Sequence, residues 1–239
     1  MQLTTKLTPT PIPLLFYRVS RLQLAGLGRR LARVLGVHRP QPLTLDDLQI
    51  PDSELAKKAS ELARGCESDA LFNHSVRTYL FGLAVGLHIG MNVDRELLYL
   101  AAVLHDISLT PEYDDEGAFE LNSARAARAF LLAEKTPSER ADMIHEAIAL
   151  HTSAGIADSR EPEIALLHFG AGLDVIGLHR EDVARETRTA VLDAWPRANF
   201  KVEFDQLIKD QTTRKPDCHV ARQYRLGFKQ MIAWAPFPE

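Results

Sequence analysis

The most apolar stretch of the chain reads LLYLAAVLHD and runs from Leu97 to Asp106. Its side chains are apolar almost all the way round a helix, which predicts a buried helix at the centre of the fold. Asp94 precedes the stretch and is a suitable N-cap for a helix from Arg95 to His105. The stretch ends on an imidazole and a carboxylate, two polar groups that are costly to bury without partners.

Helical periodicity also dominates the sequence on both sides of this segment, and no alternating pattern of useful length predicts a strand. Gly65 is expected to close one helix, and Ser138 and Pro162 are expected to open two others. The sequence therefore predicts an all-α fold with a single domain over residues 46–239 and a basic N-terminal arm over residues 1–45. Further helices are expected over residues 52–64, 69–88, 122–134, 138–151, 162–177, 182–194, 201–214 and 217–233.

The composition is that of a soluble globular protein, since 46% of the 239 residues are hydrophobic and 25% are charged. No apolar run approaches the roughly 20 residues that span a bilayer. Cys66 and Cys218 are too few for a disulfide framework and indicate a reducing compartment, so we expect a cytoplasmic protein. The net charge of -4 argues against a surface built for nucleic acid.

Residues 1–45 differ in charge from the rest of the chain, because they hold seven basic residues and no acidic residue. The stretch from Leu14 to Leu35 has apolar residues at helical spacing and predicts an amphipathic helix. We interpret this helix as packing on the protein's own body or on a second subunit, and we expect a homo-oligomer. Contact of the arm with a membrane surface is the alternative. Nucleic-acid binding is not expected, because no aromatic residues are interleaved with the arginines.

Histidines concentrate in the middle of the chain, where six of the nine lie between His74 and His168. His74 and Arg77 are three residues apart and share one face of an otherwise apolar helix. His151 lies on the inward face of its helix, whereas His145 is one position off that face and is expected at the helix surface. A polar ring inside an apolar helix needs a partner. Such histidines are therefore either core residues with a hydrogen-bond partner or ligands.

Asp174 lies in the stretch FGAGLDVIG, residues 169–177, and shares a helix face with Leu167 and Ala171. Its side chain therefore points where apolar residues point. A buried carboxyl without a partner takes up a proton, whereas a metal ion keeps it charged. The small residues around it allow close approach of another element, so the pattern favours a functional carboxylate.

Two imidazoles and two carboxylates on three predicted helices can converge on one ion. Mixed nitrogen and oxygen donors suit zinc, iron, manganese or cobalt and leave coordination positions open for water. His151 and His168 are candidates for general acid–base groups or for ligands of a second ion. For the His105–Asp106 pair the alternative is a hydrogen-bonded pair that ends the helix. The predicted ligands of a divalent metal ion are His74, His105, Asp106 and Asp174.

The order His, His-Asp, Asp on helices resembles the HD-domain superfamily of metal-dependent hydrolases. The residues around these positions resemble the cyanamide hydratase branch of that superfamily. This resemblance covers about residues 50–235, leaves the basic arm outside it, and implies an HD-domain helical bundle. The segments that carry it are FNHSVRTYLFG (72–82), LLYLAAVLHD (97–106), EAIALHTS (146–153) and PEIALLHFGAGLDVIG (162–177).

The resemblance implies a zinc-containing hydratase that adds water to a nitrile and makes urea from cyanamide. Glu120 and the pair His151–Thr152 fall where this branch lines its pocket. Two positions depart from the pattern: Ser108 stands where glycine is usual, and His145 stands where tryptophan is usual. The residues that correspond to the metal ligands of this branch are again His74, His105, Asp106 and Asp174.

The expected reaction is attack of metal-activated water on an electrophilic carbon of a small substrate, since the pKa of water falls to about 7 on such an ion. His151 or His168 can supply the proton that the substrate nitrogen takes up. Arg77 is expected to orient a substrate group or, alternatively, to form a salt bridge with Glu120 or Asp106.

Hydrolysis of a nucleotide or another small phosphate ester is the alternative reaction, because it is the commoner activity in the wider superfamily. Such an enzyme needs cationic groups around the phosphate oxygens. No dense basic cluster adjoins the motifs, and no glycine-rich phosphate loop is present. A binding module that keeps the metal as a structural element is a third hypothesis, and the additional inward-facing histidines argue against it. The candidates for holding phosphate are Arg77, Arg125, Arg128 and Lys201.

Overall fold

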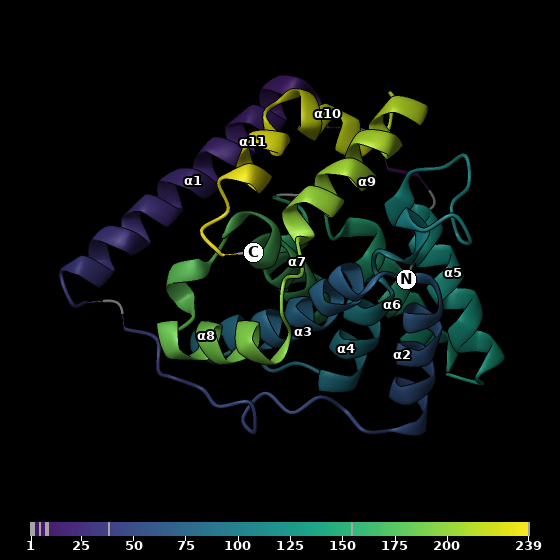
Figure 1. The fold of residues 1–239 in the computed structure, drawn as a ribbon, viewed down its shortest axis with the longest axis horizontal. Coiled ribbons are helices and arrows are strands. Elements are labelled where there is room, and N and C mark those ends of the chain that lie inside the picture. The colour runs from purple at the N-terminus through teal and green to yellow at the C-terminus, as the bar shows by residue number, and fades with distance from the viewer. Residues whose placement is uncertain (1–2, 5, 8–9, 38, 154, 239) are drawn as a thin grey trace.

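The computed structural model describes residues 3–4, 6–7, 10–37, 39–153 and 155–238. These residues form α-helices and short 3-10 helices and contain no strand, which confirms the all-α prediction (Figure 1). The α-helices are α1 (Ile12–Val34), α2 (Glu54–Cys66), α3 (Asp69–Ile89), α4 (Arg95–Leu104), α5 (Phe119–Ala133), α6 (Ser138–Leu150), α7 (Pro162–Ile176), α8 (Arg185–Ala194), α9 (Phe200–Arg214), α10 (His219–Arg225) and α11 (Phe228–Ala233). The 3-10 helices are η1 (Ile107–Leu109), η2 (Ala157–Ser159) and η3 (Arg180–Asp182).

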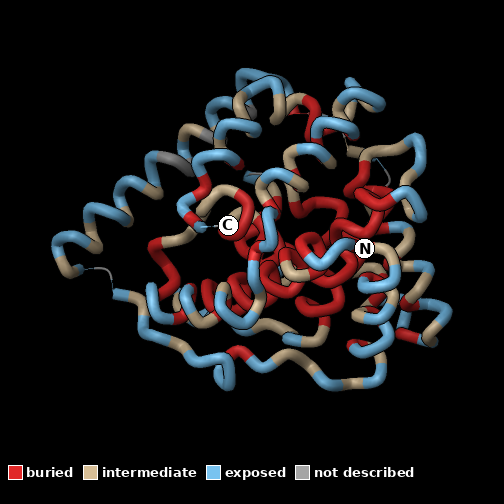
Figure 2. Tube along the Cα trace, viewed as in Figure 1, coloured by how far each residue is buried: buried red, intermediate tan, exposed pale blue. Residues whose placement is uncertain are grey.

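Helix α4 is the central buried helix that its apolar sequence predicts. Leu98, Leu100 and Leu104 are each 0% exposed, and they pack with buried side chains of α3, α6 and α7. The Asp94 carboxylate accepts a hydrogen bond from the backbone N–H of Leu97 at 3.0 Å, so it caps the helix as expected. Figure 2 shows the buried residues gathered in the interior, with the exposed residues around them.

Helices α3 and α7 cross with their backbones in contact, and glycines make this contact feasible. A Cβ atom on Gly82 would lie 2.5 Å from the carbonyl oxygen of Leu166, and a Cβ on Gly170 would overlap the carbonyl oxygen of Thr78. Any side chain at either glycine would therefore push the two helices apart. The close crossing fixes α3, which carries His74 and Arg77, against α7, which carries Asp174.

Several helix ends differ from the expectation for local reasons. Gly65 lies inside α2, which ends one residue later without a left-handed residue. Helix α5 begins three residues before Asn122, because the Asn122 amide donates to two carbonyl groups of the preceding loop instead of capping a helix. Ser138 is the first residue of α6 and makes no capping bond. Gly227, with φ of 97°, divides the predicted helix over 217–233 into α10 and α11.

Helix α1 lies along one side of the molecule, with one end beside α10 and α11 (Figure 1). It packs on the protein's own body through arginines that face η3. Nη1 of Arg33 lies 2.9 Å from the Glu181 carboxylate, and Nε of Arg29 lies 3.4 Å from the Asp182 carboxylate. Contact with a second subunit or a membrane surface stays a prediction, as does the boundary between arm and body. Large apolar side chains of α1 that remain exposed include Phe16, Leu24, Leu27 and Leu31.

None of the described helices combines the length and the apolar character that crossing a membrane requires.

Candidate metal centre and its pocket

Three of the predicted ligands meet in the core of the bundle. His74 comes from the first half of α3, His105 is the C-cap residue of α4, and Asp106 follows it directly. Each offers one ligand atom, and these atoms all lie within 4.8 Å of one another. The three side chains are almost fully buried, at 0%, 1% and 1% exposure. Because the apolar helix α4 ends directly before His105 and Asp106, both side chains lie next to His74.

Four buried histidines share one hydrogen-bonding pattern, in which Nδ1 is bonded to an oxygen atom. Three of the acceptors are backbone carbonyls, which cannot donate, so Nδ1 carries the hydrogen in these rings. The fourth acceptor is the Asp174 carboxylate. In the neutral rings Nε2 therefore keeps its lone pair, which is the form that binds a metal ion. The Nδ1–oxygen distances are 2.7 Å for His74 to Asp174, 2.7 Å for His105 to Ala102, 2.7 Å for His151 to Ile148 and 2.6 Å for His168 to His151.

The atoms that face one another in this cluster are acceptors. Nε2 of His105 lies 3.2 Å from Oδ2 of Asp106, and Nε2 of His74 lies 3.6 Å from the same oxygen. Within the described part of the chain, neither Nε2 atom nor Oδ1 of Asp106 has a hydrogen-bond partner. Buried acceptors without donors are costly. A cation among them removes this cost, so the residues fit a divalent metal ion.

The charge states agree with this interpretation. Burial opposes ionisation of Asp106, but the neighbouring His105 lowers the pKa of this carboxyl to about 2, so it is charged at neutral pH. Burial also opposes protonation of His105, but the charge of Asp106 and hydrogen bonds raise its pKa. Burial lowers the pKa of His74, and it lowers the pKa of His151 to about 3. Both rings are thus neutral at pH 7.

Asp174 stands directly behind His74, outside the group of three. Its Oδ2 accepts from Nδ1 of His74 at 2.7 Å and from Nη2 of Arg77 at 2.8 Å. Its Oδ1 accepts from Nε of Arg77 and from Nη1 of Arg197, each at 2.9 Å. Burial opposes its ionisation, yet the arginines and His74 hold the pKa of Asp174 far below its usual range. A carboxylate in this place orients the imidazole of His74, and its role as a direct ligand stays a prediction.

Arg77 is fully buried and forms its ion pair with Asp174, so the expected alternative pairing with Glu120 or Asp106 is wrong. Arg197, at 3% exposure, is a second partner of Asp174 that the sequence did not reveal. It follows α8 in an irregular segment, where no periodicity signals burial. The one available signal was the buried charge of Asp174, which requires a cation nearby.

Glu120 and Thr152 lie beside the cluster but occupy different places. The Thr152 hydroxyl donates to Oε1 of Glu120 at 2.8 Å. Glu120 is fully buried behind Thr152, and burial raises its pKa to about 7. Thr152 lines the cavity that contains the cluster, as do His151 and His168. Thr152 thus connects the Glu120 carboxyl to the cavity wall.

Two further expectations concern residues near the site. His145 is buried, at 3% exposure, so the expected surface position is wrong. It lies in the part of α6 where residues on every side of the helix are buried against neighbouring elements. Ser108 donates from its hydroxyl to the carbonyl of Phe119 at 2.6 Å and lies 2.9 Å from the Ser123 hydroxyl. Ser108 thus ties the segment after the His-Asp pair to α5.

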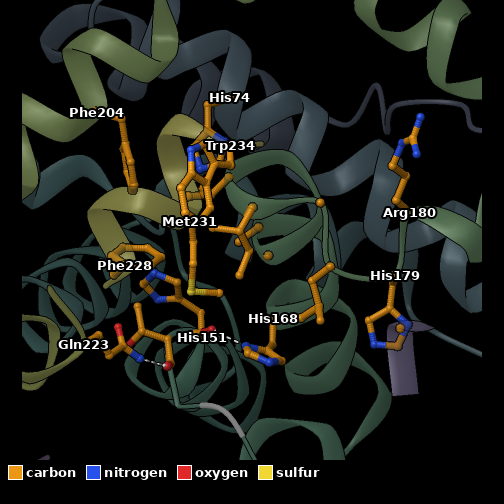
Figure 3. Close-up of a pocket in the computed structure, with 18 of the residues that line it drawn as sticks. His74, His151, His168, His179, Arg180, Phe204, Gln223, Phe228, Met231 and Trp234 are labelled. Atoms are coloured by element: carbon orange, nitrogen blue, oxygen red, sulfur yellow. Dashed lines mark hydrogen bonds between the residues drawn. The ribbon is translucent and has the colours of Figure 1, made fainter. Parts of the chain in front are cut away.

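A cavity of about 410 Å³ opens onto the cluster. Its walls combine elements of the core with segments distant in sequence: α1 contributes Gly26, Leu27, Arg29 and Arg30, and the C-terminal helices contribute mainly apolar side chains. Figure 3 shows Met231 projecting into the space between His74 and His168. The sequence did not identify these lining residues, because their spacing is that of any amphipathic helix. The C-terminal lining residues are Phe204, Ile208, Val220, Gln223, Leu226, Phe228, Met231 and Trp234.

A helical bundle with a buried His, His-Asp group is the arrangement expected of an HD domain, and comparison with known proteins agrees. The HD domain family matches residues 71–190, half of the chain, a range that includes all four predicted ligands. The chain belongs to the HD domain family. It is also 25% identical over 193 residues to two proteins of Saccharomyces cerevisiae, Cyanamide hydratase DDI2 and Cyanamide hydratase DDI3. Each alignment covers 77% of this chain and 84% of the relative.

Proposed function

We propose that this protein is a zinc-dependent hydratase that adds water to the carbon–nitrogen triple bond of a small nitrile, as in the conversion of cyanamide to urea. The observation that carries the proposal is the buried group of His74, His105 and Asp106, whose unpaired acceptor atoms open onto a cavity. The distant likeness to the two yeast cyanamide hydratases supports the choice of reaction.

The residues divide into three roles. His74, His105 and Asp106 would hold the ion, and Asp174 would orient the ring of His74 through Nδ1 in place of serving as the predicted fourth ligand. When bound, the metal ion supplies Lewis acidity, which lowers the pKa of water to about 7. His151 is neutral at pH 7 because its pKa is lowered to about 3, so it can accept a hydrogen bond from the attacking water. His168, on the cavity wall, would take up the proton that the water loses and pass it to the substrate nitrogen.

Two buried groups would position these residues. Arg77 acts through Asp174, which holds the ring of His74, and so it does not orient a substrate group directly. Glu120 acts through Thr152, whose hydroxyl it fixes at the cavity wall. Since the pKa of Glu120 is raised to about 7, this carboxyl can also exchange a proton near neutral pH.

The phosphohydrolase alternative has less support from the positions of its candidate cations. The Arg77 side chain is bound to Asp174, Arg128 pairs with Asp142 at 2.7 Å, and Lys201 donates to a carbonyl at 2.8 Å. Arg125 pairs with the side chain of Asn122. None of these four basic residues is among the described residues that line the cavity.

The test is a metal analysis combined with parallel assays. Purified protein is expected to contain zinc and to form urea from cyanamide, and Asp106→Ala is expected to lose metal and at least 100-fold in kcat/KM. His88→Ala is the matched control, because this histidine lies at the opposite end of α3 from His74. Phosphate release from a nucleotide panel, with no action on nitriles, would favour the phosphohydrolase instead.

A further inference from the structure

We infer that the substrate carries an uncharged apolar group much larger than the amino group of cyanamide, and that the distal wall of the cavity binds this group. The inference rests on the proposed hydratase function and specifies its substrate class. Three observations carry it: the volume of the cavity, the chemistry of its distal wall, and the pairing of the charged residues on the lining.

The cavity is far larger than cyanamide requires. A molecule with three heavy atoms takes up about the space of two water molecules, or ~60 Å³. The cavity measures about 410 Å³, which lies in the range of ~300–1,000 Å³ typical of cavities that enclose drug-sized ligands. With cyanamide at the cluster, most of the space would remain for other atoms.

Much of the wall away from the cluster is apolar. Helix α9 contributes Ile208, and the segment from Val220 onward contributes Phe228 and Met231. Phe204 of α9 extends this apolar surface to the cluster, since its ring centroid lies 5.7 Å from that of His74. Figure 3 shows Phe204, Phe228 and Met231 around the same space as His74 and His151. Water in such surroundings finds few hydrogen-bond partners, so an apolar group that displaces it binds favourably.

The three arginines of the lining form ion pairs with carboxylates: two pair with Glu181 on the lining, and one pairs with Asp182 next to it. Nε of Arg30 lies 3.7 Å from Glu181, and Nη1 of Arg180 lies 3.5 Å from the same carboxylate. Arg29 lies 3.4 Å from Asp182. An anionic substituent would compete with these carboxylates, and for this reason we assign an uncharged group.

Polar side chains on the wall are likewise occupied by the protein. Nε2 of Gln223 donates to the carbonyl of Thr152 at 2.7 Å. Nδ1 of His179 lies 2.6 Å from Asp182, and its ring lies against Phe169 with the centroids 4.2 Å apart. These contacts leave the apolar surface as the main feature that a ligand meets beyond the cluster. The substrate class that we assign is therefore a nitrile or cyanamide with an aromatic or branched aliphatic substituent.

The experiment compares cyanamide, benzylcyanamide and 4-carboxybenzylcyanamide as substrates of the zinc-loaded protein, with the ureas quantified by mass spectrometry. Benzylcyanamide is expected to show at least tenfold higher kcat/KM than cyanamide. Calorimetry supplies a second measurement, in which benzylurea is expected to bind at least tenfold more tightly than urea.

Variants test the location of the apolar group. Met231→Trp fills part of the space beyond the cluster, and it is expected to lower the preference for benzylcyanamide over cyanamide at least tenfold. Phe228→Trp is a second variant with the same expectation if the first is unstable. Val202→Trp is the control, because this side chain on α9 is 59% exposed and is not among the lining residues. Its preference is expected to equal that of the wild type.

The outcomes separate the two proposals. Equal or higher activity on cyanamide, or a preference for the carboxylated compound, would overturn the inference and leave the hydratase function standing. If no nitrile is hydrated, the hydratase function fails, and calorimetry decides the inference alone. In that case tight binding of benzylurea supports the apolar class, and equal binding of urea and benzylurea overturns it.

Discussion

Replacement of Gly170 by alanine is expected to destabilise the protein more than most substitutions of this size. The added methyl group would overlap the carbonyl oxygen of Thr78 and lie 2.9 Å from the backbone nitrogen of Gly82. Both neighbours are backbone atoms of α3, so no side-chain rotation relieves the clash. The two helices must separate by about 1.5 Å to restore an ordinary contact distance near 3.5 Å.

The magnitude follows from the cost of overpacking. Forced insertion of a methyl group into a packed core costs about 1–3 kcal/mol, and the backbone clash places Gly170→Ala near 3 kcal/mol. For a chain of this length that loss lowers Tm by about 6–12 °C. Separation of α3 from α7 also moves Asp174 away from Arg77 and His74. We therefore expect weaker zinc binding as well as lower stability.

The assay is thermal unfolding by circular dichroism, combined with a zinc titration of the metal-free protein. Gly65→Ala is the matched control, because Gly65 lies inside α2 and a Cβ there meets no atom within 4 Å. Alanine in place of a helical glycine is expected to raise the stability by about 0.5–1 kcal/mol. If Gly170→Ala had the same Tm and the same zinc affinity as the wild type, the close helix crossing described above would be refuted.

Three other predictions concern charge and metal. Zinc at 1,000 times its Kd is expected to stabilise the metal-free protein by about 4 kcal/mol in a thermal-shift assay, and His105→Ala should abolish this shift. Asp174→Asn leaves two buried arginines without a carboxylate and should cost about 3–5 kcal/mol in urea unfolding at pH 7. Because the folded-state pKa of Asp174 is lowered, the wild type loses this stability only below about pH 4, as the carboxyl protonates, and the variant should lack that dependence. Burial, and to a smaller extent the charge of Asp106, raises the pKa of Glu67. The folded metal-free protein therefore retains a proton that the unfolded chain releases above about pH 4.5. Its stability should fall as pH rises, and Glu67→Gln should remove that slope; an unchanged slope would contradict the assignment.

The helices of the core could be predicted from the sequence because the apolar pattern that defines each helix lies within that helix. Leu97 to Leu104 must be buried wherever the helix lies, and the terminal His105 and Asp106 need a partner that also interrupts an apolar helix. His74 is such a residue, and the structure brings it to them. The order of these groups resembles that of the HD-domain superfamily, and the match over residues 71–190 confirms the family.

The remaining parts of the site depend on distant contacts that leave no local signal. Arg197 is buried only because Asp174 lies beneath it, and the residues before and after it show no helical pattern. The lining from α1 and α11 arises from how these amphipathic helices pack on the core, and their apolar faces fit many partners. His145 was placed wrongly because α6 is covered on more sides than one stripe implies.

Two parts of the chain form the cavity. The cluster lies within the 71–190 segment that matches the HD domain family, whereas α1, α9, α10 and α11 supply much of the rest of the cavity wall. In the proposed enzyme, substitutions in this wall would alter which molecules enter without moving a residue of the metal cluster. Selectivity and reactivity can therefore diverge independently among descendants of one ancestor, and an engineer could exchange the wall while keeping the catalytic frame.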